Sequence, residues 1–278
     1  MAPAKILDGR IAARIVKAEV AQALAKLKNK PGLATVLVGD DAGSHSYVNG
    51  KHRDCSQVGI NSIRVELPAS VSQADLLEEV DKLNRSKDCS GLIVQLPLPA
   101  HIDTNVVLGA IDPDKDADGL HPINLGKLAL SQAGVVPCTP GAIVELLKRN
   151  QISLEGKEVV IIGRGTTVGR PLSLLLSSKG IDATVTLLHS KSSDIKSHTR
   201  RADILIAALG RAHFLTSDMV KQGVVAVDVG ITRNASRLVG DIDPGVSKVA
   251  SAIAPMPGGV GPMTRALLLS NLLMLHKE

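Results

Sequence analysis

Residues 158–169 read Glu-Val-Val-Ile-Ile-Gly-Arg-Gly-Thr-Thr-Val-Gly, and this stretch decides the fold of the second half of the chain. The apolar run at 158–162 predicts a buried strand, and glycines at 163, 165 and 169 form the loop after it. A helix is predicted next, over residues 171–179. A glycine loop between a strand and a helix lets backbone N–H groups approach a dinucleotide phosphate. The GxGxxxG spacing is one residue longer than the usual dinucleotide fingerprint. The prediction of a nucleotide site therefore rests on the position of the loop between a strand and a helix.

The residues that follow the next predicted strand, 184–188, indicate which nucleotide binds. An NAD site usually has Asp or Glu at this place to bind the ribose 2′-OH. Here His189, Ser190 and Lys191 follow instead, and Arg164 adds a cation in the glycine loop. A hydroxyl and cations suit a 2′-phosphate, so NADP is favoured over NAD. The alternative is that Arg164 and Lys191 are ordinary solvated surface charges.

The rest of the chain alternates apolar runs with helical segments. Further buried strands are predicted at residues 33–38, 63–67, 91–96, 204–208 and 224–229. Helices are predicted at 44–57, at 72–86 after a Ser72/Asp75 capping box, and at 139–150 after a Thr139-Pro140 start. Both halves therefore predict α/β domains, with a doubly wound parallel sheet and a boundary within 139–155.

Composition limits the classes of partner. The chain has 278 residues, of which 44% are hydrophobic, but it contains one Tyr, one Phe and no Trp. So few aromatic rings argue against binding nucleic acid by base stacking. The net charge of +5, without a basic run, fits an anionic small ligand, although it can also serve solubility alone.

The cysteines and histidines give no metal pattern. Cys55, Cys89 and Cys138 lie far apart without a CxxC pair, and the eight histidines show no ligand spacing. This predicts a reducing compartment, hence the cytoplasm, and no metal. We see no signal peptide and no apolar run long enough for a membrane span, so no membrane partner is expected.

Several polar residues of the first half stand where chemistry is possible. Tyr47 and Lys51 are four residues apart on a predicted helix and so share a face. A lysine in a cleft can have its pKa lowered and then move protons, although one that snorkels past a ring is the ordinary alternative. Gln95 ends a predicted strand, where α/β sheets bind ligands. Asp118 lies in an acidic loop, where a turn role is the ordinary alternative.

Residues 257–264 read Pro-Gly-Gly-Val-Gly-Pro-Met-Thr and precede an apolar helical stretch. Glycine allows a close approach to a ligand and proline stiffens the backbone, so this loop is either a ligand wall or a tight turn before a helix.

Read together, these segments resemble the bifunctional methylenetetrahydrofolate dehydrogenase/cyclohydrolase family, over nearly the whole chain. The resemblance is carried by motifs in a fixed order: Ser44-x-x-Tyr47-Val48-x-x-Lys51 with Gly59-Ile60, Gln95-Leu96-Pro97-Leu98-Pro99, Asp116-x-Asp118-Gly119, Pro137-Cys138-Thr139-Pro140, Gly163-Arg164-Gly165 through Val168-Gly169-x-Pro171, Asp228-Val229-Gly230-Ile231, and residues 257–264.

The resemblance implies roles for individual residues. Lys51 resembles the catalytic lysine, Tyr47 the ring that stacks on the aminobenzoyl group, Gln95 the partner that tunes the lysine, and Asp118 the carboxylate that holds the pterin. All four are candidate catalytic residues. The implied cofactor contacts are Gly163, Arg164, Gly165, Thr166, Ser190 and Ile231. The implied substrate contacts are Ser44, Tyr47, Gln95, Leu96, Pro97, Asp118, Pro257, Gly258, Gly259, Pro262 and Thr264.

The resemblance also implies the reaction and the domain plan. NADP would oxidise 5,10-methylenetetrahydrofolate, and the methenyl product would be hydrolysed to 10-formyltetrahydrofolate. A folate-binding domain is expected at 1–139, completed by a helix at 263–278, with a Rossmann-type NADP-binding domain at 140–262 and an active-site cleft between them. A homodimer is expected, in one-carbon metabolism that serves purine, methionine and histidine biosynthesis.

Two alternatives remain open at this point: another NADP-dependent dehydrogenase of small metabolites, and a non-enzymatic regulator that binds folate or nucleotide. The chain also departs from the family pattern at a few positions. Gly165 stands where Ser is frequent, Ala142 where Gly is common, and Ala254 and Met256 replace the usual Thr and Val.

Overall fold

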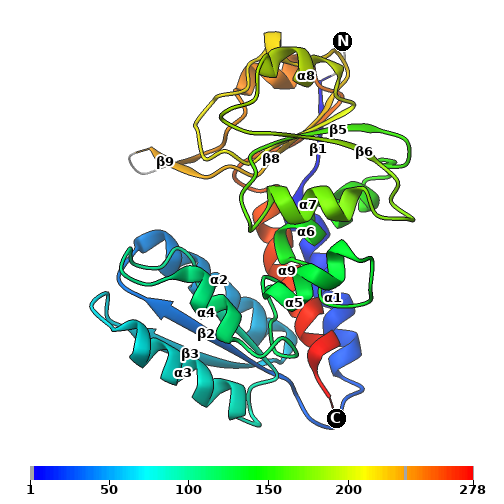
Figure 1. Cartoon of the computed structure of the whole chain (residues 1–278). Coiled ribbons are helices and arrows are strands. Elements are labelled where there is room, and N and C mark those ends of the chain that lie inside the picture. The colour runs from blue at the N-terminus through cyan, green and yellow to red at the C-terminus, as the bar shows by residue number, and fades with distance from the viewer. Residues whose placement is uncertain (1–2, 235–236, 278) are drawn as a thin grey trace. The chain divides into compact units, whose positions relative to one another are not determined.

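The computed structural model describes residues 3–234 and 237–277. By its internal contacts the chain forms two compact units, drawn in Figure 1. Unit 1 comprises Met1–Ala13, Leu128–Ser131 and Thr139–Thr264, and unit 2 comprises Arg14–Lys127, Gln132–Cys138 and Arg265–Glu278. Each unit has its own sheet and its own buried core.

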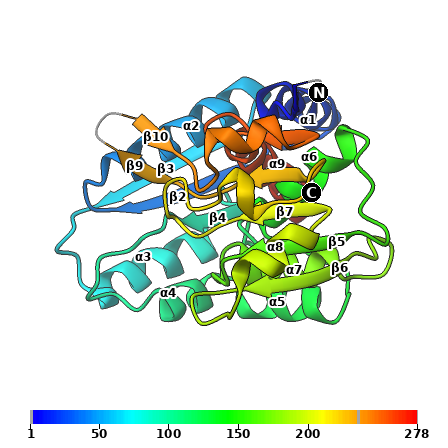
Figure 2. The same ribbon diagram turned by 90° about the horizontal axis from the view of Figure 1, so that it is seen from above.

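Unit 1 is built on a parallel six-stranded sheet. The order across it is β1 (Lys5–Ile6), β11 (Ala252–Ala254), β8 (Val225–Asp228), β7 (Ile204–Ala207), β5 (Glu158–Ile162) and β6 (Thr184–Leu188). Figure 2 shows β5, β6 and β7 side by side. The chain passes from β5 to its neighbour β6 and then returns to the other side of β5 as β7. This reversal confirms the predicted doubly wound sheet.

Apolar side chains explain why these segments are strands. The four residues of β7 and the last four of β5 are fully buried, as expected for strands covered on both faces. Unit 1 also contains α7 (Gly169–Leu176), α8 (Ile195–Arg201), most of α6 (Cys138–Arg149), and two short 3₁₀ turns, Ser217–Met219 and Pro244–Lys248. Pro171 lies in the first turn of α7, where the missing N–H costs no helical hydrogen bond.

Unit 2 is built on a parallel three-stranded sheet in the order β3 (Asn61–Leu67), β2 (Gly32–Val38), β4 (Gly91–Val94). The central strand β2 is buried at all seven positions. One face carries α2 (Ala42–Val58), and the other carries α3 (Gln73–Arg85) and α4 (Thr104–Ala110) (Figures 1 and 2). The core under α3 and α4 contains Ala34, Val36, Leu76, Val80, Leu92 and Val107. Unit 2 also contains α5 (Pro122–Ala129).

Local signals set the helix ends of unit 2. Asp41 caps α2 by accepting from the Ser44 N–H at 2.7 Å, and Gly59 ends it at φ 85°. The predicted capping box is present, with the Asp75 N–H donating to Ser72 Oγ at 3.1 Å.

Other parts of the structure differ from the sequence predictions. The strands β1 and β11 were not predicted, because two- and three-residue strands show no periodicity. The helix α1 (Gly9–Leu24) was also missed. The antiparallel hairpin of β9 (Thr232–Asn234) and β10 (Arg237–Val239) was also missed. The last helix, α9 (Val260–Leu275), begins inside the 257–264 stretch rather than after it. Helix α6 begins at Cys138, so Thr139 lies within its first turn instead of preceding it.

Two buried carboxylates, Asp228 and Asp241, bond the backbone segments that follow β10 and β7. Asp228 accepts from the backbone N–H groups of Asp241 and Ile242, at 2.9 and 3.0 Å. Asp241 in turn accepts from three successive N–H groups, those of Leu209, Gly210 and Arg211. A Cβ on Gly240 would lie 1.8 Å from Asp228 Oδ2, so only glycine fits beside this carboxylate.

Asp228 should make the stability of unit 1 depend on pH. Burial raises the pKa of Asp228 to about 6 from its ordinary 3.8. Between these values the folded state binds more protons than the unfolded state, so stability falls as pH rises through the window. In Asp228→Asn this part of the dependence disappears, a difference of roughly 2–3 kcal/mol across the window. Urea unfolding of both proteins from pH 4 to 7 is the measurement, and parallel curves would contradict the assignment.

Candidate active site

Lys51 is the centre of the candidate site in unit 2. It lies on the buried face of α2 and is only 5% exposed. Its Nζ donates to Gln95 Oε1 at 3.1 Å and lies 5.2 Å from the centroid of the Tyr47 ring. The structure therefore brings together Tyr47, Lys51 and Gln95 as predicted, from one helix and one strand end.

The charge state of Lys51 follows from these surroundings. The pKa of Lys51 is lowered, chiefly because burial disfavours the ammonium form. The charge of Asp118 acts in the opposite direction, and the Arg265 cation adds to the lowering. Burial is the largest of these effects, so the lowered pKa allows the neutral amine to form at a lower pH than in an exposed lysine. A neutral amine can accept a proton.

Gln95 is oriented by its own hydrogen bonds. It follows β4 directly, and its backbone N–H donates to Val36 O at 2.8 Å, which fixes its place at the sheet end. Its side-chain Nε2 donates to Leu96 O at 2.7 Å. The amide therefore presents its oxygen to Lys51, and a neutral amide does not favour the ammonium form as a carboxylate would. Leu96 and Pro97, both predicted substrate contacts, follow on the same loop.

Asp118 lies in a loop that a neighbouring carboxylate holds. Asp116 is 1% exposed and accepts from the Gly119 N–H, the His121 N–H and Asn124 Nδ2, at 3.0, 2.8 and 2.8 Å. Gly119 has φ 73°, a conformation that favours glycine. Asp118 itself is half-buried and acts electrostatically on Lys51. The two aspartates of this loop therefore differ. Asp116 is buried and bonds the loop backbone, whereas Asp118 is half-buried.

Asn271 of α9 is a further buried contact of this loop. Its Nδ2 donates to Ala117 O at 3.0 Å and to Val136 O at 2.9 Å, so it joins the segments before Asp118 and before Cys138. The Cys138 N–H donates to Asp118 O at 3.1 Å. Sequence reasoning missed Asn271 and Asp116. Only the Asp116-x-Asp118 motif hinted at the second, and nothing local to Asn271 indicated partners more than 130 residues away.

The candidate nucleotide site in unit 1 follows the carboxyl ends of parallel strands. Gly163, at φ 113°, directly follows β5, and a Cβ there would lie 2.1 Å from Ala208 O. A Cβ on Gly169 would lie 1.8 Å from Gly163 O. A Cβ on Gly165 would meet nothing within 4 Å. Two of the three glycines are therefore required by the backbone packing of the loop, and the third borders open space.

The other predicted cofactor residues are all exposed. Arg164 and Thr166 lie in the loop after β5, Ser190 follows β6, and Ile231 follows β8. Ile231 is 55% exposed. Ligands of open α/β sheets bind beyond this edge of the sheet, so the placement suits a cofactor site.

The predicted substrate residues divide between the two units. Ser44, Leu96 and Pro97 belong with Lys51 to unit 2, and Ser44 is buried in the first turn of α2. The predicted substrate residues of the 257–264 stretch belong to unit 1; they are Pro257, Gly258, Gly259, Pro262 and Thr264. There Gly258 O accepts from the Gly9 N–H at 2.9 Å, and a Cβ on Gly9 would overlap Gly259 O. Part of this glycine content therefore serves packing against the start of α1.

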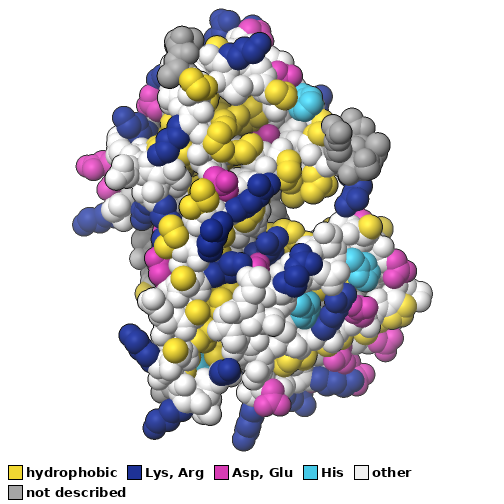
Figure 3. Space-filling view, turned by 180° about the vertical axis from the view of Figure 1, so that it is seen from behind, with side chains coloured by type: hydrophobic (Ala, Val, Ile, Leu, Met, Phe, Trp, Pro, Cys, Tyr) yellow, Lys and Arg dark blue, Asp and Glu magenta, His cyan; other side chains and the backbone are white. Residues whose placement is uncertain are grey.

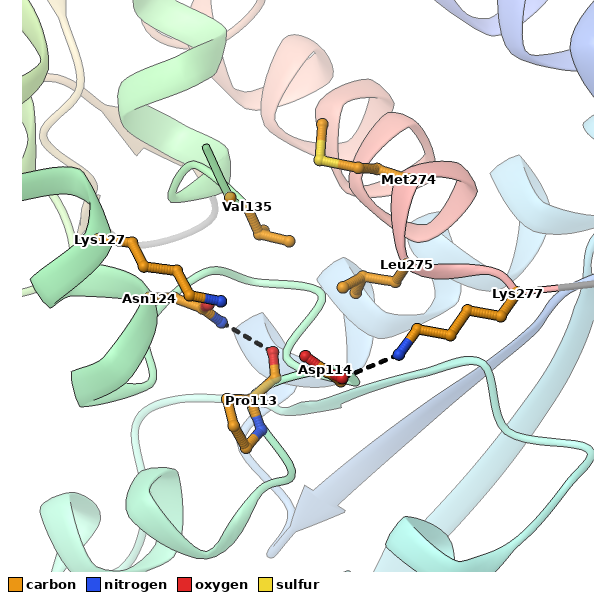
Figure 4. Close-up of a pocket in the computed structure, with 9 residues that line it drawn as sticks. Pro113, Asp114, Asn124, Lys127, Val135, Met274, Leu275 and Lys277 are labelled. Carbon is orange, nitrogen blue, oxygen red and sulfur yellow. Dashed lines mark hydrogen bonds and ion pairs between the residues drawn. The ribbon is translucent and has the colours of Figure 1, made fainter. Parts of the chain in front are cut away.

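A separate pocket of about 170 Å³ lies in unit 2 (Figure 4). Its wall is formed by Pro113, Asp114, Asn124, Lys127, Gly134, Val135, Met274, Leu275 and Lys277. In Figure 4 Lys277 reaches Asp114, an exposed ion pair of 2.9 Å. None of the predicted site residues lines this pocket, so we do not assign it to the active site.

Charged side chains of the described residues do not form a single basic patch on the face seen in Figure 3. Lys and Arg side chains are spread over the face seen in Figure 3, with Asp and Glu among them. Within residues 3–234 and 237–277, no helix is both long and apolar enough to cross a bilayer.

Comparison with known proteins identifies the family. Residues 7–118 match the family model of the tetrahydrofolate dehydrogenase/cyclohydrolase catalytic domain, and residues 137–278 match that of the NAD(P)-binding domain of the same family. The chain belongs to the tetrahydrofolate dehydrogenase/cyclohydrolase family. This confirms the resemblance, the two α/β domains and the dehydrogenase/cyclohydrolase activity. The domain bounds and the roles of single residues stay predictions.

Solved structures agree with this assignment. The bifunctional methylenetetrahydrofolate dehydrogenase/cyclohydrolase FolD of Campylobacter jejuni is 44% identical over 98% of both chains, with a TM-score of 0.94. The Trypanosoma brucei enzyme, solved with NADP and an inhibitor, is 39% identical over 99% of this chain and 98% of that one, also at 0.94. Shikimate 5-dehydrogenase of Thermus thermophilus is only 14% identical, at 0.56 over 88% of this chain and 98% of that one, and shares the fold alone.

The glycine loop yields a prediction with an internal control. Gly163→Ala and Gly169→Ala place a Cβ against backbone oxygens and should destabilise unit 1 by ~1–3 kcal/mol or more. Gly165→Ala and Gly165→Ser enter open space and should stay within ~0.5 kcal/mol of the parent. Thermal unfolding of the four variants measures this, and equal losses at all three positions would contradict the loop geometry.

Proposed function

We propose that the chain oxidises 5,10-methylenetetrahydrofolate to 5,10-methenyltetrahydrofolate with NADP and hydrolyses the product to 10-formyltetrahydrofolate. The observation that carries this proposal is the buried amine of Lys51, bonded to Gln95 and beside the single tyrosine of the chain. A lysine with a lowered pKa in this setting is equipped for proton transfer. Family membership supplies the substrate.

NADP is the cofactor in this proposal, as in the Trypanosoma brucei complex. The residues present fit a dinucleotide, because Gly163 and Gly169 make a tight loop after β5 while Gly165 leaves space in front of it. Arg164 and Ser190 are exposed at this edge and would hold the 2′-phosphate. Thr166 and Ile231 would make further contacts. When bound, the nicotinamide ring accepts the hydride from the methylene carbon.

Lys51 would act in the hydrolytic step. Water attacks the methenyl carbon, and the neutral amine of Lys51 accepts the proton that the water gives up. The bond from that carbon to N5 then breaks, N5 takes a proton and the hydroxyl loses one. One proton is released in total, which balances the conversion of the methenyl cation into a neutral formyl amide. Gln95 would keep the amine aimed at this position by accepting its hydrogen bond.

The remaining site residues would bind the folate. Tyr47 is half-buried, and its ring would stack on the aminobenzoyl group. Asp118 would accept from N–H groups of the pterin. The proposed contacts also include Ser44, Leu96, Pro97, Pro257, Gly258, Gly259, Pro262 and Thr264. In this proposal the segment 1–139 with the helix at 263–278 serves folate and 140–262 serves NADP.

The cellular setting is part of the same proposal. The three cysteines are buried and free, which fits a reducing compartment such as the cytoplasm. The homodimer, and the supply of one-carbon units to purine, methionine and histidine biosynthesis, rest on the family resemblance. Neither a nucleic acid nor a membrane is among the proposed partners.

A single assay tests the proposed reaction. The purified chain is mixed with 5,10-methylenetetrahydrofolate and NADP, and the absorbance of NADPH and of the methenyl product is followed, with shikimate and 2-hydroxy acids as alternative substrates. NADPH formed only with the folate supports the proposal. Turnover of another substrate would favour a different dehydrogenase, and folate binding without turnover would favour a regulator.

Replacement of Lys51 tests the mechanism. Lys51→Met keeps the stem and removes the amine, so hydrolysis of the methenyl compound should fall by ~10²-fold or more. Hydride transfer should fall less, because it depends mainly on how the two ligands are stacked. The matched control is Lys82→Met on α3, whose ammonium is exposed and paired with Glu78 at 3.0 Å. Near-full cyclohydrolase activity of Lys51→Met would contradict the proposed role.

Replacement of Arg164 tests the choice of cofactor. Arg164→Ala should weaken NADP binding by ~1–3 kcal/mol, the size of a charge-assisted contact, and leave NAD binding nearly unchanged. Arg200→Ala is the control, because Arg200 is an exposed cation of α8 that donates to Asp218 O at 2.9 Å. Titration calorimetry with both nucleotides measures the difference. Equal losses for NADP and NAD would remove Arg164 from the 2′-phosphate.

A further inference from the structure

Asp54 is a nearly buried carboxylate three residues after Lys51 on α2. Its side chain is 7% exposed and contacts two cations. Lys17 Nζ, from α1, lies 2.8 Å from Oδ1, and Arg265 Nε, from α9, lies 2.7 Å from Oδ2. Lys17 also donates to Gln57 Oε1 at 2.8 Å. Three helices of unit 2 thus meet at one carboxylate, on the helix face that carries Lys51.

Arg265 lies directly against the backbone beside Lys51. A Cβ on Gly50 would be 3.1 Å from one terminal nitrogen of the guanidinium and 3.2 Å from its central carbon. Gly50 is itself buried, so the absence of a side chain is what admits the cation at this place. The bond to Asp54 fixes the planar guanidinium there.

We propose that Asp54 and Arg265 form a positioning pair for Lys51, in which Asp54 anchors the guanidinium so that its fixed positive charge lies beside the lysine. Neither residue is required to touch the folate or NADP. This inference rests on the proposed role of Lys51 in hydrolysis, and it adds residues outside the motifs that carry the family resemblance.

The charges that face Lys51 come from several elements. Asp118 on the loop before α5 favours the ammonium form, whereas Arg265 on α9 disfavours it. The thiols of Cys55 on α2 and Cys138 at the start of α6 also face the amine, but burial raises the pKa of each thiol and keeps it neutral. Because like charges repel across a poorly solvated site, a fixed cation close to the amine shifts the balance towards the neutral form. An arginine suits this task because it keeps its charge at every relevant pH.

Two charge-changing variants separate this role from a merely structural one. Arg265→Gln removes the cation and keeps an amide that can bond Asp54. Lys51 then loses its proton only at higher pH, so the low-pH limb of the pH–rate profile for hydrolysis should move to higher pH. Asp54→Asn leaves Arg265 and Lys17 without their carboxylate, so the same limb should move to lower pH. Opposite displacements are the signature of charge acting on Lys51. A packing defect would lower the rate in both variants without displacing the limb.

The rate constants provide a second reading. At neutral pH, kcat for hydrolysis should fall in Arg265→Gln by less than the ~10²-fold expected for loss of Lys51, while KM for the folate changes little. Arg265→Lys keeps a cation and should retain a profile close to that of the parent. The matched control is Arg85→Gln, because Arg85 is an exposed α3 residue paired with Asp81 at 2.8 Å.

A direct titration keeps this inference separate from the proposed function. Protein labelled with ¹³C at lysine Cε is titrated by NMR, and Lys51→Met assigns the Lys51 signal. An ordinary lysine titration of Lys51 in the parent protein would overturn the proposed role of Lys51. A depressed titration that stays unchanged in Arg265→Gln would overturn only the positioning pair. If Arg265→Gln does not fold, Asp54→Asn provides the test. The titration midpoint of Lys51 should then move to lower pH, and a midpoint that stays in place or moves to higher pH contradicts the inference.

Discussion

The burial of one amine, that of Lys51, is the constraint on which the candidate site depends. An ammonium group removed from water is costly, and the structure gives Lys51 Nζ a neutral acceptor, Gln95 Oε1, rather than an ion pair. An amide satisfies the hydrogen bond without restoring the charge. The elements around the amine must then hold their places closely, because a small outward movement would let water return and the ammonium form with it.

Buried carboxylates hold backbone segments in place at several other points of the chain. Asp116, Asp228 and Asp241 each accept two or more backbone N–H groups of a loop or strand end, so each replaces the water that these groups would otherwise need. Asp118 is half-buried in the same loop as Asp116 and acts electrostatically on Lys51. Two aspartates of one loop thus have different surroundings, which the acidic sequence alone did not indicate.

Sequence reasoning succeeded where the signal is local. Apolar runs located β5 and β6 and thereby the nucleotide loop, and the i, i+4 spacing placed Tyr47 and Lys51 on one helix face. It failed for β1, whose two residues gain strand geometry only by pairing with β11 about 250 positions later. The bonds of Asn271 and of Arg265 also join residues far apart along the chain, at separations of 135, 154 and 211 positions. Their side chains have no partner within their own helix that would reveal them.

The two ligand sites differ in how closely they depend on the fold. Arg164 and Ser190 are exposed at the ends of strands, so exchanging them changes few contacts within the protein. Lys51 and Asp54 are nearly buried, and changing either leaves a polar group without its partner. The proposed preference between NADP and NAD therefore rests on side chains whose exchange leaves the sheet intact. The groups proposed to set the protonation of Lys51 also bond α2 to its neighbours, so changing them removes more contacts within the protein.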